Sequence, residues 1–296
     1  MNVHSLIDAV IVNLTKKFAG KKRFFSENIE SPRISELVKT ISFDIPKINR
    51  VGLYKVEVDT PAGILTPQFK VQKWLGSQYP TYIYHHGNSE RPLKIRPFAR
   101  NTFYKIFVRE KIPVQANLIA LVSPLHVMPV GKMQKSYRDI RYITSSLSST
   151  AVLVEQIIGQ LRKNGSGKIS VCGISLGGFV TNIHRAFFNT ADFYIPLLAG
   201  AALGEIFIRS DFEALTSDLF KENHNKVRAI MNFDKEFMMV SKRNVFPLLG
   251  RFDRFIELET HVKCYGSHPL KIINRGHATA AFSAKTLREH ILDSSL

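Results

Sequence analysis

Three side chains that are far apart in the sequence have the types needed for nucleophilic catalysis: Ser175, Asp253 and His277. A serine hydroxyl is a poor nucleophile near neutral pH, so it needs a neighbouring histidine that takes its proton as it attacks. The histidine in turn needs a carboxylate that fixes its tautomer and stabilises the imidazolium. The three residues can act together only if the fold brings them to one place.

Ser175 lies in the segment 173–178, whose sequence is GISLGG. The apolar run 169–172 precedes this Gly-x-Ser-x-Gly pattern, and a plausible helix, 179–186, follows it. In a strand–turn–helix context the glycines remove Cβ atoms where the chain folds back, so the serine sits in a strained turn with its hydroxyl exposed. The pattern alone also arises by chance, so the flanking elements carry the prediction of a nucleophile.

Asp253 and His277 each follow a predicted strand. The apolar run 245–249 precedes Asp253, and 270–273 precedes His277. Strands alternate with helices from about residue 80 onward, which predicts an α/β protein with a mostly parallel sheet and helices on both faces. Because sites in such sheets form at the carboxyl ends of the strands, we expect Asp253 and His277 to lie near Ser175.

The oxyanion that forms on an attacked carbonyl needs preorganised donors, usually backbone N–H groups. The N–H of Leu176, at the start of the helix after the serine, is one candidate. Another predicted strand, 79–85, runs into the polar turn 86–88 at the same edge of the sheet. We expect the second donor to come from this turn, from the N–H of Asn88.

The chain resembles an α/β-hydrolase. The resemblance rests on HHGN at 85–88, GISLGG at 173–178, GRFDR at 250–254 and RGHA at 275–278, in an order and spacing that match that family over about residues 50–292. It implies an eight-stranded, mostly parallel sheet, a lid inserted before the strand that carries the acid, and no cofactor. The HGGG motif typical of one esterase branch is absent, so the sequence assigns no subfamily.

The predicted organisation is an N-terminal helical extension (1–50), an α/β core (51–199 and 242–296) and a helical lid (200–241). The lid segment is rich in large apolar side chains, which could line an acyl pocket or pack the lid on the core. They include Phe207, Phe212, Phe220, Phe233, Phe237, Met238 and Met239. A further helical pattern over about 133–163 is interrupted by a serine-rich stretch around 145–150.

Other residues compete for some of these roles. Glu257 and Asp234 are alternative acids, but Asp253 follows its strand most directly. His86 is expected to hold its turn through hydrogen bonds. His126 could line the site, although a solvent-facing position is expected. The sequence shows no spacing typical of metal ligands, and a glycine-rich stretch at 164–168 lacks the spacing of a phosphate loop.

The composition describes a basic globular chain. Among 296 residues, 41 are Lys or Arg and 24 are Asp or Glu, giving a formal charge of +17. This excess favours anionic surroundings, or it serves solubility. The charge is spread along the chain and no nucleic-acid module is recognised, so we expect no nucleic acid partner. Two cysteines give no disulfide framework, and without a secretory signal or a long apolar run we expect a cytoplasmic location.

The first 25 residues predict an amphipathic helix with a basic end. One face carries Val3, Leu6, Ile7, Val10, Ile11, Leu14 and Phe18, and the end carries Lys16, Lys17, Lys21, Lys22 and Arg23. Such a helix could lie on an anionic membrane. It could also pack its apolar face on the domain, which is the norm for one-faced helices and is the expectation here.

Two functions follow from these observations. The first is a serine hydrolase acting on a small-molecule acyl substrate, most simply a carboxylic ester, through Ser175, His277 and Asp253 and an acyl-enzyme. Thioesters and amides fit the same mechanism. The alternative is a binding protein with this fold and little or no catalysis, acting at an anionic membrane or partner surface, because fold alone does not establish activity.

Overall fold

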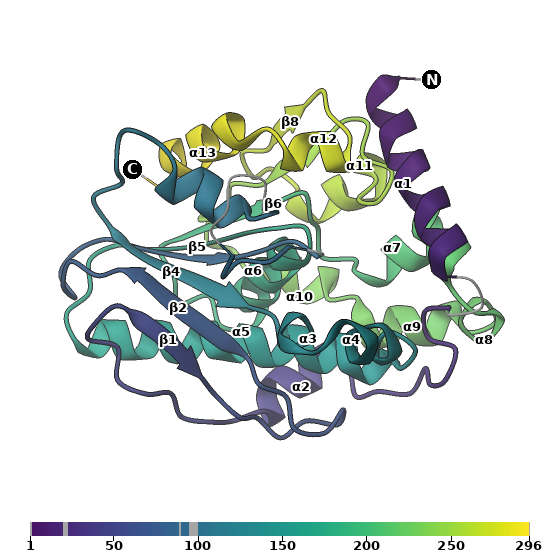
Figure 1. Ribbon diagram of the computed structural model, residues 1–296, viewed down its shortest axis with the longest axis horizontal. Coiled ribbons are helices and arrows are strands. Elements are labelled where there is room, and N and C mark those ends of the chain that lie inside the picture. The colour runs from purple at the N-terminus through teal and green to yellow at the C-terminus, as the bar shows by residue number, and fades with distance from the viewer. Residues whose placement is uncertain (1, 20–22, 89, 95–99, 296) are drawn as a thin grey trace.

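An eight-stranded sheet forms the centre of the protein (Figure 1). The computed structural model describes residues 2–19, 23–88, 90–94 and 100–295. Within them the strand order is β1-β2-β4-β3-β5-β6-β7-β8. The strands are β1 (Gly52–Lys55), β2 (Gln68–Lys73), β3 (Thr81–His85), β4 (Asn117–Val122), β5 (Ile169–Ile174), β6 (Phe193–Leu197), β7 (Leu248–Gly250) and β8 (Lys271–Ile273).

The sheet is antiparallel at one edge and parallel elsewhere. β2 pairs antiparallel with both β1 and β4, and all pairs from β4 to β8 are parallel. In the middle, Ile83 of β3 pairs with Ile119 of β4 and Val171 of β5. All residues of these three strands are buried, as expected for parallel strands that are covered on both faces. The predicted mostly parallel, eight-stranded sheet is confirmed.

Helices cover both faces of the sheet. On one face α2 (Ile34–Thr40), α5 (Ile140–Lys163) and α6 (Leu176–Phe187) share a core with Ile169 and Val171 of β5. On the other, the π-helix η1 (Tyr104–Val108) and α13 (Ala284–Asp293) share a core with Cys172 and Ile174 of the same strand. Alternate residues of β5 thus belong to two different cores, because successive side chains of a strand point to opposite faces of the sheet.

The segment between β6 and β7 is helical, as predicted. It contains α7 (Gly204–Arg209), η2 (Asp211–Leu215), α8 (Asp218–Lys221), α9 (His224–Met231) and α10 (Asp234–Met239). The phenylalanines at positions 207, 220, 233 and 237 are buried in the same core as α5 and α6, while Met238 and Met239 are exposed. This supports packing on the core as the role of these aromatic residues; the description of the segment as a lid stays a prediction.

The predicted interruption of the helix at 145–150 is wrong. α5 runs through this stretch without a break, and its serines and threonines are buried. Thr150 Oγ1 donates to the carbonyl of Ser146 at 2.7 Å, and Ser146 Oγ lies 3.0 Å from Ser123 Oγ. A hydroxyl that bonds back to the preceding turn is satisfied inside a helix, so serines and threonines need not end it. The hydroxyls of Ser145 and Ser148 are buried in the same stretch without such a partner among the described residues.

The expectation that the N-terminal helix packs its apolar face on the domain is also wrong. α1 (Val3–Ala19) buries Asp8 and Val12, while the aliphatic residues from Val3 to Leu14 on its other side are exposed. Lys21 and Lys22 lie outside the described residues, and so does the side chain of Phe18. Polar contacts of Asp8, described with the site below, outweigh the usual preference for burying the apolar face.

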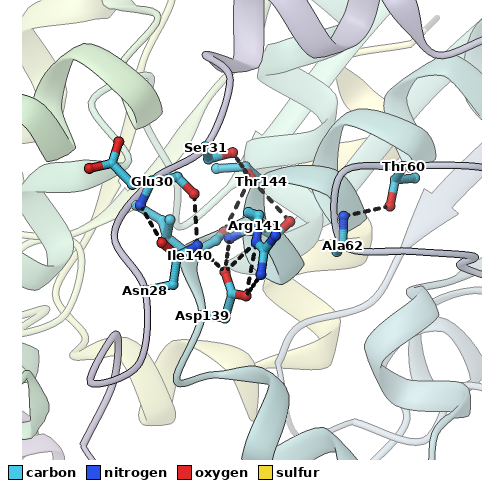
Figure 2. A network of polar contacts seen from close by, with 9 residues as sticks. All are labelled: Asn28, Glu30, Ser31, Thr60, Ala62, Asp139, Ile140, Arg141 and Thr144. Carbon is cyan, nitrogen blue, oxygen red and sulfur yellow. Dashed lines mark hydrogen bonds and ion pairs between the residues drawn. The ribbon is translucent and has the colours of Figure 1, made fainter.

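The N-terminus of α5 is tied to the preceding segment by a polar network around Asp139 (Figure 2). Asp139 Oδ1 accepts hydrogen bonds from the backbone N–H of Arg141 at 2.9 Å and from Asn28 Nδ2 at 2.8 Å. The Arg141 guanidinium pairs with the same carboxylate at 2.6 Å. Asp139 therefore caps the long helix and fixes residues 28–31 against it.

We expect Asp139→Ala to lower the free energy of unfolding by about 2 kcal/mol, because a helix cap and a buried hydrogen bond are lost together. Asp139→Asn keeps an oxygen at the cap and should cost less than about 1 kcal/mol, since the ion pair with half-exposed Arg141 contributes little. Urea denaturation of both variants measures the difference. Equal losses in the two variants would show that the ion pair, and not the cap, is stabilising.

Candidate active site

Ser175 sits in a strained turn between β5 and α6. Its φ of 54° and ψ of −113° lie in a region that L-residues rarely occupy. α6 begins at the next residue, Leu176. Backbone strain of this kind is held only when the surrounding packing fixes the turn, and here the packing is unusually close.

The glycines of the turn are needed for contact between elements. A Cβ on Gly173 would overlap the backbone of Gly177, and a Cβ on Gly177 would overlap the carbonyl of His85 at the end of β3. A Cβ on Gly178 would lie 2.6 Å from the Cβ of Ala199, just after β6. The first turn of α6 is thus pressed against the ends of three neighbouring strands, and this fixes the position of Ser175.

The structure brings Ser175, His277 and Asp253 together. His277 begins α12 (His277–Ala281), and its Nε2 lies 3.0 Å from Ser175 Oγ. On the other side of the ring, Nδ1 lies 2.7 Å from Asp253 Oδ2. Asp253 is buried, and its second oxygen accepts hydrogen bonds from the N–H groups of Phe255 and Ile256, both at 2.8 Å. All three residues follow carboxyl ends of parallel strands, as expected.

The competing acids lie elsewhere. Glu257 immediately precedes α11 (Leu258–His261), and Asp234 opens α10. The Nδ1 of His277 is bonded to Asp253, so geometry selects Asp253 among the three carboxylates.

The surroundings of His277 favour its protonated form. Burial lowers the pKa of His277, but the neighbouring Asp253 carboxylate and, more weakly, that of Asp8 raise it, and the net pKa lies above its usual value. The Phe255 ring packs against the imidazole, with centroids 5.0 Å apart. An imidazolium formed here during proton transfer would therefore be stabilised.

Asp8 is one of two residues at the site that the sequence did not reveal. Its fully buried carboxylate accepts hydrogen bonds from the N–H groups of His277 at 2.7 Å, Ala278 at 3.0 Å and Arg254 at 3.3 Å. It binds the first turn of α12 and the loop that carries Asp253 at once. A Cβ on Gly276 would lie 2.7 Å from Asp8 Oδ2, so the glycine of the RGHA segment leaves room for α1 to pack here. The available signal was that Asp8 is the one acidic residue between positions 1 and 25.

The predicted oxyanion donors, Leu176 and Asn88, follow the ends of two neighbouring strands, β5 and β3. The N–H of Leu176 belongs to the first turn of α6, whose N–H groups have no acceptor within the helix. Asn88 follows β3, and its Oδ1 accepts a hydrogen bond of 2.8 Å from the Tyr137 hydroxyl. Burial raises the pKa of Tyr137 to about 12, so its hydroxyl stays a donor. The two backbone donors remain a prediction.

A second missed residue, Glu90, holds the turn that contains Asn88. Its buried carboxylate accepts hydrogen bonds from the N–H of Gly87 at 3.1 Å and from the N–H of Thr102 at 2.7 Å. The Thr102 hydroxyl also contacts Tyr84 Oη at 2.6 Å. Burial outweighs these hydrogen bonds and raises the pKa of Glu90. The network ties the turn after β3 to the segment before η1.

Three histidine rings lie beside this turn: His85 stacks on His86, and His126 meets His86 edge-on. His86 donates from Nδ1 to the carbonyl of Gly87 at 2.7 Å and accepts from the N–H of Ser123 at 3.1 Å, which confirms its predicted role in holding the turn. His126 does not face solvent as expected: it is half-buried, its ring lies 4.6 Å from that of His86, and burial lowers its pKa to about 4. Among the described residues no cluster could hold a metal ion.

Comparison with known proteins identifies the architecture. No protein-family model and no curated protein matches the chain. Among solved structures, an acetyl xylan esterase from Paenibacillus sp. R4 aligns with a TM-score of 0.55 and 11% identity, over 89% of this chain and 92% of that one. Est1E from Butyrivibrio proteoclasticus aligns with a TM-score of 0.52 and 15% identity, over 81% and 98%. The chain has the α/β-hydrolase fold.

Acetyl xylan esterase 1 from a Thermoanaerobacterium species aligns over 90% of this chain and 96% of its own, with a TM-score of 0.51 and 13% identity. At such identities the likeness concerns the fold, and an α/β-hydrolase fold carries many activities. The arrangement at Ser175 must therefore carry any conclusion about chemistry. It can support proton transfer from the serine to His277 and attack on an electrophilic carbonyl.

We expect Asp8→Asn to lower kcat at least about tenfold, because the turn that holds His277 loses part of its anchoring. Activity requires neutral His277 and so rises with pH through the pKa of that residue. Removing the Asp8 charge removes an influence that raises this pKa, so the acidic limb of the kcat/KM profile should move to lower pH.

Ser5→Ala is the matched control for this prediction. It removes a contact from the same face of α1, the hydrogen bond from Ser5 Oγ to the Phe252 carbonyl, without changing charge. Its acidic limb should coincide with that of the wild type. An Asp8→Asn profile that also coincides with the wild type would contradict the role given to Asp8.

Proposed function

We propose that this protein is a serine hydrolase that cleaves a small-molecule carboxylic ester. The observation that carries the proposal is the continuous contact from Ser175 Oγ through the His277 ring to Asp253, at 3.0 Å and 2.7 Å. Ser175 is the proposed nucleophile, His277 the general base and Asp253 the group that orients and stabilises the imidazolium.

In the proposed reaction, Ser175 Oγ forms a bond to the acyl carbon while its proton moves to His277 Nε2. The N–H groups of Leu176 and Asn88 stabilise the oxyanion. The tetrahedral intermediate then collapses, the ester C–O bond breaks, and His277 returns the proton to the leaving alkoxide. Water then gives a proton to His277 and bonds to the acyl carbon. The bond between that carbon and Ser175 Oγ breaks, His277 returns the proton to Ser175 Oγ, and the carboxylic acid is released.

The choice of ester as the substrate class draws on the structural neighbours. Those with TM-scores above 0.5 include acetyl xylan esterases and Est1E. Their names describe those proteins and favour an oxygen ester here. An acylaminoacyl peptidase also aligns, with a TM-score of 0.55, so an amide remains the second substrate class for the same site. The reaction needs no group beyond the side chains and backbone of the site.

A second role, binding at an anionic surface with little catalysis, is favoured by a different observation: the exposed apolar side of α1. The bonded geometry of Ser175, His277 and Asp253 argues against loss of catalysis, since a fold used only for binding would have no need of it. Surface binding is thus better regarded as an addition to hydrolysis than as its replacement.

We expect Ser175→Ala and His277→Ala each to lower kcat for p-nitrophenyl acetate by at least about 1,000-fold. When catalytic residues act together, removing one of them removes most of the rate enhancement that the whole set provides. Steady-state release of p-nitrophenolate measures this. Ser267→Ala, at an exposed serine on the surface, is the control and should retain full activity. Similar rates for the wild type and Ser175→Ala would contradict the proposal.

A further inference from the structure

α1 presents a continuous aliphatic surface to solvent. Val3, Leu6, Ile7, Val10, Ile11 and Leu14 recur at helical spacing, and each is between 37% and 60% exposed. Scattered exposed aliphatic residues are common on proteins, but six on one side of one helix form a contiguous patch. Such a patch usually marks a surface that is covered by a partner.

The inner side of α1 fixes this orientation. His4 stacks on Phe252, with ring centroids 6.2 Å apart, and Asp8 makes the three hydrogen bonds described above. Val12 is buried on the same side. Rotating α1 about its axis to bury the aliphatic residues would break all of these contacts and leave the Asp8 carboxylate without its hydrogen-bond donors. The exposed apolar face is therefore a property of the folded protein.

The charge around the patch is positive. Lys16 and Lys17 are exposed at the end of α1, while its acidic residue, Asp8, is turned inward. Lys16, Arg23 and Lys221 line a hollow at this end, together with Ala214, Thr216, Ser217 and Asp218. Asp218 is the acid in that lining, and its carboxylate lies 3.9 Å from Lys221. Lys17 thus borders the aliphatic surface, while Lys16, four residues after Val12, lies on the side of α1 that faces the domain, with Arg23 and Lys221.

We infer that α1 docks the protein on an anionic lipid bilayer. The aliphatic face enters the boundary between headgroups and acyl chains, with the helix in the plane of the membrane, and the basic end contacts anionic headgroups. No helix in the described part of the chain is long and apolar enough to cross a bilayer, so the contact is peripheral.

A second copy of the chain is the main alternative occupant, and charge argues against it. Each copy carries a formal charge of +17, which opposes association of like surfaces. The same charge favours an anionic membrane. Figure 1 shows α1 along one side of the molecule beside α12, the helix that begins at His277, so docking would hold the candidate active site close to the bilayer.

Co-sedimentation with vesicles tests the inference. We expect the wild type to bind vesicles of equimolar phosphatidylglycerol and phosphatidylcholine much more strongly than vesicles of phosphatidylcholine alone. Leu6→Gln/Val10→Gln should lower the partition coefficient at least about tenfold, because exposed aliphatic area can no longer be buried. Lys16→Gln/Lys17→Gln should lower it about thirtyfold, from the attraction of two basic residues to an anionic surface.

Two controls distinguish docking through α1 from non-specific adsorption by other exposed apolar side chains and from any effect of catalysis. Ile112→Gln/Met239→Gln replaces two aliphatic side chains that are 80% and 82% exposed elsewhere on the surface, and it should bind like the wild type. Ser175→Ala should also bind like the wild type, since docking does not depend on the proposed hydrolysis. Circular dichroism checks that every variant is folded.

Three results would overturn the inference: no binding to the anionic vesicles, equal binding to both kinds of vesicle, or unchanged binding by Leu6→Gln/Val10→Gln. Sedimentation velocity tests the alternative that a second copy of the chain covers the aliphatic face. A wild-type dimer that Leu6→Gln/Val10→Gln converts into a monomer would assign the aliphatic face to a second copy of the chain and not to a membrane.

Discussion

The close packing of the first turn of α6 against the strand ends is the constraint on which the site depends. Gly177 contacts the end of β3, and Gly178 contacts the residues after β6, at distances that leave no room for a Cβ. This contact determines how α6 leaves the sheet and holds Ser175 at a positive φ. Close packing of the surrounding core offsets the strain of that conformation, so the serine is positioned before any substrate arrives.

The other half of the site depends on a long-range contact. Asp253 lies in the loop after β7 and His277 begins α12 after β8, and both strands are only three residues long at one end of the sheet order. Asp8 joins these loops from the opposite end of the sequence, through N–H groups of Arg254, His277 and Ala278. Burying this carboxylate is unfavourable, and its hydrogen bonds offset only part of the cost: burial raises the pKa of Asp8, and the N–H groups of Ala278 and His277 lower it by less. α1 is consequently a part of the site and not an appendage.

The sequence was sufficient to predict those site residues whose positions follow from the order of the strands. Ser175, Asp253 and His277 could be predicted because each follows a strand in a parallel sheet, where carboxyl ends share one edge. Asp8 and Glu90 could not, because they act by accepting hydrogen bonds from backbone N–H groups, which lie far along the sequence for Asp8 and nearby for Glu90, and neither belongs to a motif. Similarly, the burial of serines in α5 depends on hydroxyl contacts such as Ser123 with Ser146.

The outward apolar face of α1 illustrates the same limit. Periodicity shows that a helix has an apolar side, but not which side meets the protein. In this chain the buried carboxylate of Asp8 determines which side of α1 faces the protein. The packing of the phenylalanines between β6 and β7 is also a tertiary result: their frequency was equally consistent with a pocket and with a core, and only the arrangement of α7 to α10 distinguishes the two.

The central claim is that Ser175 is an activated nucleophile. Mass spectrometry of the intact protein after exposure to a fluorophosphonate tests it most directly, with peptide mapping to locate the adduct. The account predicts one adduct per chain, on Ser175, and none on the folded His277→Ala variant. No adduct on the folded wild type, or an adduct on another serine, would contradict it.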